Sequence, residues 1–373
     1  MSVTNIPNKI KYKLWARAAG RCEYCNKPLW EDLITKAQFS TAYIAHIIAE
    51  KPGWARYDPV LSEKLKHDFS NLMLLCDTHH RLIDVEDVEG HPADKLREIK
   101  RNHEERVRIQ TELSEDKQSH ILHYGANIGR LNAFVTWFQS KDAMFPTHYP
   151  AESNAIELHL SNSPFQDSEQ DYWNLERNNL QRQFASKVHQ RLGKDIKNLS
   201  VFAIAPQPLL IELGRLLSDV TGITVYQHQK EPEDNWRWAQ IEMPVDYQVT
   251  KPLVDSETVA LNLSLSATID NSRITSVLGN ASVWTLTIAE PYNDFLKSQS
   301  QLQAFRERFR KLLNEIKAVH GQDKVIHVFP AVPVSIAVEI GRVWMPKADL
   351  PLRIYDQNYK LGGFVEAFTI DSK

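Results

Sequence analysis

Cysteines and histidines near the start of the chain have the spacing of a metal site. Two residues separate Cys22 from Cys25, and two residues separate Cys76 from His79. Two close pairs of sulfur and imidazole ligands are typical of a structural zinc ion in a tetrahedral site. The sequence therefore predicts that Cys22, Cys25, Cys76 and His79 bind zinc.

Three further polar residues follow the order His46, Asn71 and His80. An imidazole, whose pKa lies near neutrality, suits a general base that takes a proton from water, and we assign this role to His46. We expect Asn71 to hydrogen-bond across a hairpin and to hold its geometry. His80 is predicted to bind a catalytic Mg²⁺ or similar ion, which polarises a phosphate and stabilises the leaving oxygen.

This set of residues resembles the HNH family of ββα-metal nucleases, over roughly residues 10–90. The resemblance implies an α+β fold, a zinc-stabilised hairpin followed by a helix, and deoxyribonuclease activity. Many family members carry an acidic metal ligand immediately before the histidine base, where this chain has Ala45. Asp77 or Asp84 is a candidate substitute, and each also fits an exposed position on a helix.

A zinc-stabilised binding module without catalysis is the alternative interpretation. Such a module needs no second histidine beside the zinc-ligand histidine, and it needs neither His46 nor Asn71. The nuclease interpretation is therefore favoured.

Short elements are predicted to position these residues. A helix over residues 7–20 ends at Gly20, residues 41–48 are β-rich, and a charged helix covers residues 92–113. Asn71 to Leu75 leads into a further helix that carries His79 and His80. We expect a nuclease domain over residues 1–120 and a polar connector over residues 121–150.

The net charge of the chain gives no indication of nucleic-acid binding. Its net charge is −3, and residues 1–120 contain equal numbers of basic and acidic side chains. Five basic residues nevertheless precede the first acidic one, Glu23. Four of the five are candidates for contacts to DNA phosphates or parts of a solvated helix face: Lys9, Lys11, Lys13 and Arg17.

Cysteine usage and hydropathy favour a cytoplasmic protein. All three cysteines fall in the predicted zinc site, which fits a reducing compartment better than a disulfide framework. No apolar run is long enough for a membrane helix, and the first residues lack the apolar segment of a secretion signal. We therefore expect no membrane association.

An internal repeat dominates the rest of the chain. Residues 201–215 align without a gap with residues 328–342, and the two segments share Val, Phe, Pro, Glu, Gly and Arg. The same register pairs Phe165 with Tyr292. The repeat predicts an α/β domain over residues 151–373, made of two Rossmann-like halves at about 151–228 and 278–356.

Strands alternate with helices in both halves, which implies parallel sheets with helical crossovers. The first half is predicted to contain strands 155–160, 199–205 and 223–228 and helices 170–192 and 209–219. The second is predicted to contain strands 282–289, 325–329 and 351–356 and helices 299–319 and 334–343. Residues 229–280 between them carry extra strand material, notably residues 259–269.

Ligands of open α/β sheets bind outside the carboxyl ends of the strands. Two facing halves would gather four such loops around one pocket, which suits a ligand with repeated halves, such as a cyclic dinucleotide. Phe165 and Tyr292 either stack on bases or cap the core of each sheet, and Trp238 is either a stacking residue or a packed one. The candidate ligand-binding residues are Ser163, Pro164, Phe165, Pro206, Gln207, Arg237, Trp238, Pro291, Tyr292, Pro333 and Ser335.

The domain order resembles the effector nucleases of CBASS antiphage defence, in which an HNH nuclease is fused to a SAVED domain of two CARF-like halves. This resemblance rests also on Leu263 to Ser266, Phe329 to Ser335 and Glu339 to Arg342. It implies a nuclease that is silent until a cyclic dinucleotide from a partner synthase binds. Binding would drive assembly into a dimer to tetramer, followed by cleavage of double-stranded DNA with little sequence specificity.

Two other functions fit the same sequence. A modification-dependent restriction endonuclease would use the C-terminal domain to read altered bases in DNA. A nucleotide-responsive DNA-binding regulator would have no hydrolytic activity at all.

Overall fold

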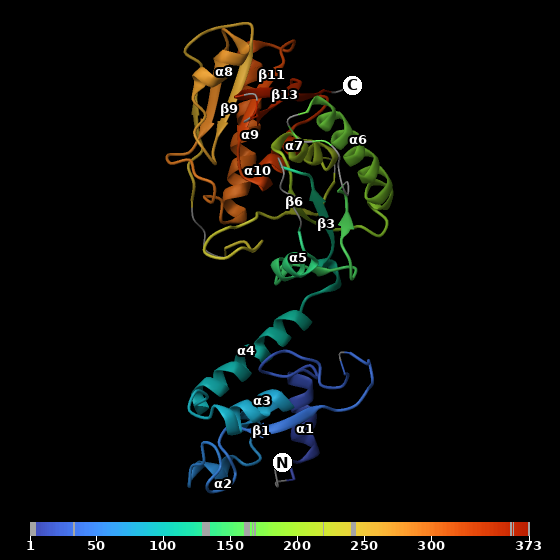
Figure 1. Ribbon diagram of the computed structural model, residues 1–373, viewed down its shortest axis with the longest axis vertical. Helices are drawn as coiled ribbons and strands as arrows, with labels where there is room; N and C mark the ends of the chain where they lie inside the picture. The colour runs from blue at the N-terminus through green and yellow to red at the C-terminus, as the bar shows by residue number, and fades with distance from the viewer. Residues whose placement is uncertain are drawn as a thin grey trace. The chain divides into compact units, whose positions relative to one another are not determined.

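The computed structural model describes residues 5–32, 34–128, 135–159, 165, 167, 169–218, 220–239, 244–358, 360 and 362–371. The chain forms two compact units, Met1–Ser114 and Glu115–Lys373, which Figure 1 shows in blue to cyan and in green to red. No described helix combines the length and the apolar character that crossing a bilayer requires.

The first unit is built around a two-stranded hairpin. Strands β1 (Ala42–His46) and β2 (Leu72–Cys76) pair antiparallel, with Ala42 opposite Cys76 and His46 opposite Leu72. Every residue of β2 is buried, since helices cover the strand. The surrounding elements are α1 (Asn8–Arg17), α2 (Leu61–Leu65), η1 (Phe69–Asn71), α3 (Asp77–Arg81), the π-helical turn η2 (Leu82–Glu86) and α4 (Ala93–Thr111).

The core of this unit is small, and it leads directly to the predicted metal ligands. Leu14 of α1, Ala18 directly after α1 and Leu96 of α4 are fully buried. Ala18 and Leu96 belong to the same apolar cluster as Cys22 and Cys76. A core of this size benefits from a metal ion that fixes its loops.

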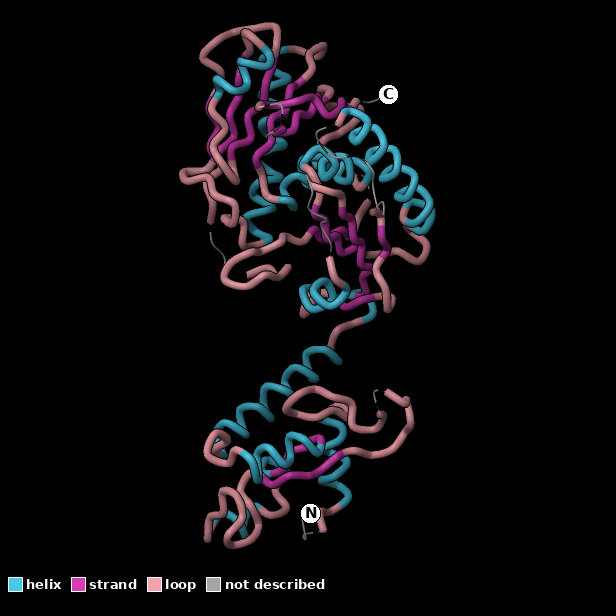
Figure 2. The backbone as a smooth tube through the Cα atoms, viewed as in Figure 1, coloured by secondary structure: helices cyan, strands magenta, loops and turns pink. Residues whose placement is uncertain are grey.

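The second unit contains two mainly parallel sheets, which appear as two groups of strands in Figure 2. In the first sheet, β6 (Leu199–Ile204) lies between β3 (Gln118–Gly125) and β7 (Ile223–Val225). The far edge of β3 is paired by β4 (Tyr149–Pro150) and β5 (Ile156–Glu157). All of these pairings are parallel.

The second sheet repeats this order. Its parallel strands are β10 (Ser282–Thr287), β9 (Val259–Ser264), β11 (Ile326–Ala331) and β12 (Leu352–Asn358), in that spatial order. Two antiparallel strands, β8 (Gln248–Thr250) and β13 (Gly363–Ile370), form its edges. The helices of the unit are α5 (Trp137–Met144), α6 (Gln170–Lys187), η4 (His189–Arg191), α7 (Gln207–Leu216), α8 (Asn271–Leu278), α9 (Gln299–His320) and α10 (Val334–Val343), and η3 (Glu115–Lys117) precedes β3.

The two halves meet along α7 and α10, which lie against each other between the sheets (Figure 1). Gly214 of α7 contacts the backbone of α10, and Gly341 of α10 contacts the backbone of α7. Beside each glycine a buried carboxylate pairs with the arginine of the same helix, Glu212 with Arg215 and Glu339 with Arg342. The two glycines shared by the repeats therefore build the close contact between the halves, while each shared Glu–Arg pair lies within one helix.

The structure corrects the predicted boundaries. Residues 121–150 are not a connector, because β3 is a central strand that pairs with β4, β5 and β6. β9, which was assigned to extra material, is likewise the central strand of the second sheet. Each half thus begins one strand earlier than about 151 or 278, and the units divide at Ser114 rather than near residue 120.

Candidate metal centre and nuclease pocket

The four predicted zinc ligands converge in the first unit. Cys22 and Cys25 lie in the turn after α1, Cys76 ends β2, and His79 lies in α3. Their ligand atoms all lie within 4.8 Å of one another. The Sγ atoms of Cys25 and Cys76 are 4.0 Å apart, and the Sγ of Cys76 is 3.1 Å from Nδ1 of His79.

This donor set fits zinc. Tetrahedral bonds of about 2.0–2.3 Å place ligand atoms roughly 3.3–3.8 Å apart, which small shifts of these side chains achieve. Burial raises the pKa of the Cys22 thiol, so a thiolate at this position needs a cation beside it. Burial lowers the pKa of His79, which keeps its imidazole in the neutral form that binds metals.

A second set of side chains supports the metal ligands. The Tyr24 ring stacks on His79 at 4.3 Å between ring centroids, and the Tyr24 hydroxyl lies 3.0 Å from Nε2 of His91. Glu23 accepts a hydrogen bond of 2.7 Å from the Leu74 amide, which ties the cysteine turn to β2. Burial raises the pKa of Glu23 to about 7. None of these contacts was predicted, because they depend on residues that meet only in the folded unit.

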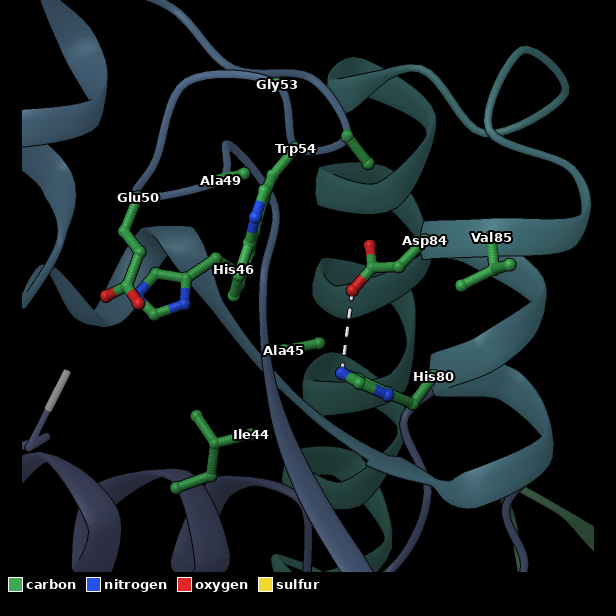
Figure 3. A pocket seen from close by; sticks show the side chains of 11 residues that line it. Ile44, Ala45, His46, Ala49, Glu50, Gly53, Trp54, His80, Asp84 and Val85 are labelled. Carbon is green, nitrogen blue, oxygen red and sulfur yellow. Dashed lines mark ion pairs between the residues drawn. The ribbon is translucent and has the colours of Figure 1, made fainter. Parts of the chain in front are cut away.

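His46 and His80 line one pocket of about 310 Å³ (Figure 3). His46 ends β1, and its Nε2 lies 3.0 Å from the carbonyl oxygen of Lys66. A carbonyl only accepts, so Nε2 of His46 carries the proton and donates it. In the neutral imidazole, Nδ1 is then the basic nitrogen, which is able to take a proton from water.

Asn71 lies beside the pocket and holds the hairpin. It is buried, its Nδ2 donates to the Ile48 carbonyl at 3.0 Å, and its Oδ1 accepts from the Ile48 amide at 2.9 Å. These paired bonds fix the chain directly after His46. The positioning role of Asn71 in catalysis stays a prediction.

Two acidic residues and one arginine complete the surroundings of the histidines. Glu50 and Asp84 line the pocket, and Figure 3 shows the Glu50 carboxylate beside the His46 ring. Oδ2 of Asp84 lies 3.5 Å from Nε2 of His80, and Arg56 pairs with Oδ1 of Asp84 at 2.5 Å. The Tyr43 ring stacks on His80 at 4.9 Å between centroids.

Sequence reasoning missed Glu50 and Arg56. Both come from the segment between β1 and β2, where no periodicity shows which side chains turn inward. For Asp84 a signal existed, since it follows His80 by one helical turn. Asp77, the other acidic candidate, is exposed and does not line the pocket.

The predicted DNA-binding residues do not form a single patch. At 100° per residue, Lys9, Lys13 and Arg17 share one flank of α1, whereas Lys11 lies beyond the buried face formed by Leu14. The Nζ of Lys13 lies 4.2 Å above the centre of the Phe69 ring. Lys9, Lys13 and Arg17 are exposed, so these three remain the candidates for phosphate contacts.

The predicted ligand-binding residues of the second unit have different environments. Ser163 and Pro164 lie outside the described residues. Phe165 is half-buried and packs against the main core, which supports the core interpretation. Tyr292 is 52% exposed, and the adjacent Pro291 is half-buried.

Gln207 and Ser335 connect the two halves to each other. Oε1 of Gln207 accepts from the Val332 amide at 3.2 Å, and the Ser335 hydroxyl donates to Oε1 of Gln227 at 2.7 Å. The buried Pro206 and Pro333 directly precede α7 and α10. The residues that follow β6 and β11 therefore contact each other, and part of the predicted hydrogen-bonding capacity is used within the protein.

The Trp236 to Trp238 segment is mainly packed. Trp236 is 1% exposed and contacts Phe202 edge-on at 5.4 Å between centroids. Trp238 is half-buried against the same cluster, and Arg237 is exposed. Arg237 is thus the residue of this segment that is open to solvent.

The chain is similar to solved structures of Cap4 SAVED/CARF-domain containing receptors. One of them is the Acinetobacter baumannii Cap4 SAVED/CARF-domain containing receptor with the cyclic trinucleotide 2'3'3'-cAAA. It is 12% identical to this chain, with a TM-score of 0.44, and the match covers 74% of this chain and 56% of the receptor. The same receptor with 3'3'3'-cAAA is 13% identical, with a TM-score of 0.45, and the match covers 85% and 68%. The Moraxella osloensis Cap4 receptor is 12% identical, with a TM-score of 0.39 and coverage of 75% and 60%.

The chain spans just over half the length of the first of these receptors. No curated protein matches the chain. A family model does match: the SMODS-associated and fused to various effectors sensor domain, abbreviated SAVED, over residues 180–370. This match begins within α6 and includes both α7 and α10. Because the matched residues make up just over half of the sequence, the chain belongs to the SAVED family.

Proposed function

We propose that this protein is an HNH deoxyribonuclease that a cyclic oligonucleotide activates through the SAVED domain. The observation that carries the proposal is the shared pocket of His46 and His80, directly beside a Cys₃His metal centre. A zinc-stabilised binding module would have no use for two histidines that face one pocket. The proposed substrate is double-stranded DNA, cut with little sequence specificity.

In this mechanism the residues of the pocket have separate tasks. Nδ1 of His46 takes a proton from the attacking water, while the Lys66 carbonyl holds the ring in the required tautomer. His80 binds a divalent ion such as Mg²⁺, which would supply charge stabilisation at the phosphate and at the leaving oxygen. Asn71 fixes the backbone after His46, and the zinc centre holds α3 against β2.

The second unit is proposed to control this activity. SAVED is a sensor-domain family, and two facing halves suit a ligand that is itself repeated, which we take to be a cyclic dinucleotide from a partner synthase. A ligand activates only through a higher affinity for the active assembly than for the inactive protein. Assembly into a dimer to tetramer would raise the local concentration of nuclease units on DNA.

The proposed biological role is antiviral defence of the CBASS type, in which activation destroys DNA inside the infected cell. The Acinetobacter baumannii Cap4 receptor was solved with two cyclic trinucleotides, so the size of the ring is varied in the test. The family match to a sensor domain favours this role over modification-dependent restriction.

The test is cleavage of a supercoiled plasmid by the purified chain with Mg²⁺, across a panel of cyclic di- and trinucleotides. We expect no cleavage without nucleotide and rapid degradation with one member of the panel. A parallel reaction uses methylated plasmid without any nucleotide. Cleavage only in that reaction would support restriction instead.

A further inference from the structure

The strand position before the proposed base offers no ligand for an ion. That residue is Ala45, which is 2% exposed and pairs with Met73 in the hairpin. Mg²⁺ prefers oxygen ligands and is usually bound through one or two carboxylates. A neutral imidazole alone, that of His80, would therefore hold such an ion weakly.

The carboxylate of Asp84 lines the same pocket as His80. Asp84 follows His80 by one helical turn, and its Oδ2 lies 3.5 Å from Nε2 of His80. Both residues line the pocket, and Figure 3 shows their side chains turned toward each other and joined by the dashed line of their ion pair. Ligand atoms at right angles around an ion with bonds of about 2.1 Å lie roughly 3.0 Å apart. A small movement brings both atoms onto one ion.

The other oxygen of Asp84 is held in place by Arg56. The guanidinium pairs with Oδ1 at 2.5 Å, and it also donates to the carbonyls of Ile47 at 2.7 Å and Ile83 at 2.6 Å. Only 8% of the Arg56 side chain is exposed. Carboxylates that bind metals commonly have such a hydrogen-bonded partner, which leaves the second oxygen for the ion.

We propose that Asp84 is a ligand of the catalytic divalent ion, together with His80, and that Arg56 orients it. The inference rests on the proposed nuclease function. The pocket then offers the ion one imidazole nitrogen and one carboxylate oxygen, with the remaining positions open to water and a DNA phosphate.

A purely structural role for Asp84 makes a different prediction. If Asp84 is only the counterion of Arg56, its removal weakens the fold and leaves the intrinsic affinity for a divalent ion unchanged. If it is a ligand, its removal weakens ion binding in a protein that is still folded. Ion affinity therefore separates the two roles without any measurement of DNA cleavage.

The experiment measures binding of Mn²⁺ to the full zinc-loaded chain by electron paramagnetic resonance, without DNA. We expect Asp84→Asn and His80→Ala each to raise the Kd for Mn²⁺ by about 10- to 100-fold. The matched control is Asp77→Asn, the same chemical change at an exposed position of α3, which should leave the Kd unchanged. Zinc content and the thermal unfolding midpoint report whether each variant is folded.

A further pair of variants removes the effect of the ion pair. Arg56→Met and the double variant Arg56→Met/Asp84→Asn both lack the Arg56–Asp84 contact, so a difference in Mn²⁺ affinity between them comes from the carboxylate. We expect the double variant to bind about 10-fold or more weakly. This comparison decides the question if Asp84→Asn alone does not fold.

If Asp84→Asn binds Mn²⁺ with wild-type affinity and His80→Ala binds it more weakly, the proposed role of Asp84 is wrong. The nuclease proposal would be unaffected by that result. Unchanged affinity in both variants would overturn the assignment of both ligands. Failure of the nuclease proposal has its own signature, which is a plasmid left intact by the wild-type protein under every activating condition.

Discussion

Gly214 of α7 and Gly341 of α10 occupy equivalent positions in the two halves, and each lies against the backbone of the other helix. A Cβ atom on Gly214 would lie 1.9 Å from the carbonyl oxygen of Val338, and a Cβ atom on Gly341 would lie 1.9 Å from that of Ile211. Val338 and Ile211 are themselves equivalent in the repeat. The close crossing thus has local two-fold symmetry, and it explains why both copies keep a glycine.

Gly341→Ala is therefore expected to destabilise the second unit. The added methyl group meets backbone atoms that cannot rotate away, so the helices must separate, at a cost of about 1–3 kcal/mol or more. Urea unfolding followed by tryptophan fluorescence measures the loss. The control is Gly363→Ala, where nothing lies within 4 Å of the added atom; equal midpoints for the two variants would contradict the crossing geometry.

The proposed zinc site is expected to stabilise the first unit. Cys76→Ser removes a thiolate ligand that joins β2 to α3, so the protein should lose its zinc and unfold at a lower temperature. Elemental analysis and a thermal scan check both effects. Thr78→Ala changes an exposed residue between the ligands Cys76 and His79 and should retain the metal. A Cys76→Ser protein that keeps stoichiometric zinc would show that the ligand set is wrong.

The two pocket histidines should be needed for cleavage and not for folding. His46→Ala and His80→Ala are expected to retain zinc and the thermal midpoint but to lose DNA cleavage by at least about 100-fold, the scale of general acid–base catalysis. His67→Ala, at an exposed position of the same unit, serves as the matched control. Normal plasmid cleavage by His80→Ala would remove the assignment of the catalytic ion to that residue.

Acid should destabilise the second unit through His327. Burial lowers its pKa from 6.5 to about 4, and its Nδ1 lies 2.9 Å from the Tyr355 hydroxyl. Between these two pH values the unfolded chain binds this proton and the native chain does not. The stabilisation is therefore complete above pH 6.5 and is lost as the pH falls toward 4.

The variant His327→Gln should lose less stability than the wild type between pH 7.5 and 5. Its amide can still accept from Tyr355 but takes up no proton. Unfolding midpoints at the two pH values measure the difference. His189→Gln, the same change at an exposed site, should keep the wild-type pH dependence, and an identical slope for His327→Gln would refute the assignment.

Substitutions of Tyr292 and Phe165, the aromatic residues at equivalent positions of the repeat, should have different effects. Tyr292→Ala is expected to raise the nucleotide concentration needed for half-maximal activation, with little change at saturation, because its ring is exposed. Phe165→Ala should instead lower the unfolding temperature, because its ring packs against the core. Titrations of cleavage against nucleotide, together with thermal scans, distinguish these effects. An unchanged activation curve for Tyr292→Ala would exclude it from the ligand site.

The parts of the site that could be predicted are those whose residues are close together in the sequence. Cys22 with Cys25 and Cys76 with His79 are close in sequence, so each pair was visible before the fold was known. Four helices of the two halves, α6, α7, α9 and α10, were predicted, whereas α5 and α8 were not. The repeat of Glu, Gly and Arg identified the duplication, although its physical cause, the α7–α10 crossing, needed the structure.

The remaining features depend on contacts between distant residues. The polar residues Ser119, His120 and His123 of β3 favour a connector when the sequence is considered alone, yet all three are buried in the structure. The structure satisfies these polar groups with partners from elsewhere, as in the hydrogen bond of 2.9 Å between Ser119 and Ser200. Arg56 likewise meets Asp84 only through the folded segment between β1 and β2. No pattern along the sequence encodes such pairs.

The most direct test follows the conversion of supercoiled plasmid by wild-type protein and by His46→Ala, each with Mg²⁺ and with or without the activating cyclic nucleotide. The account predicts rapid loss of plasmid in one reaction only, that of the wild-type protein with nucleotide. Cleavage by His46→Ala at the wild-type rate, or wild-type cleavage that does not depend on any cyclic nucleotide, would contradict it.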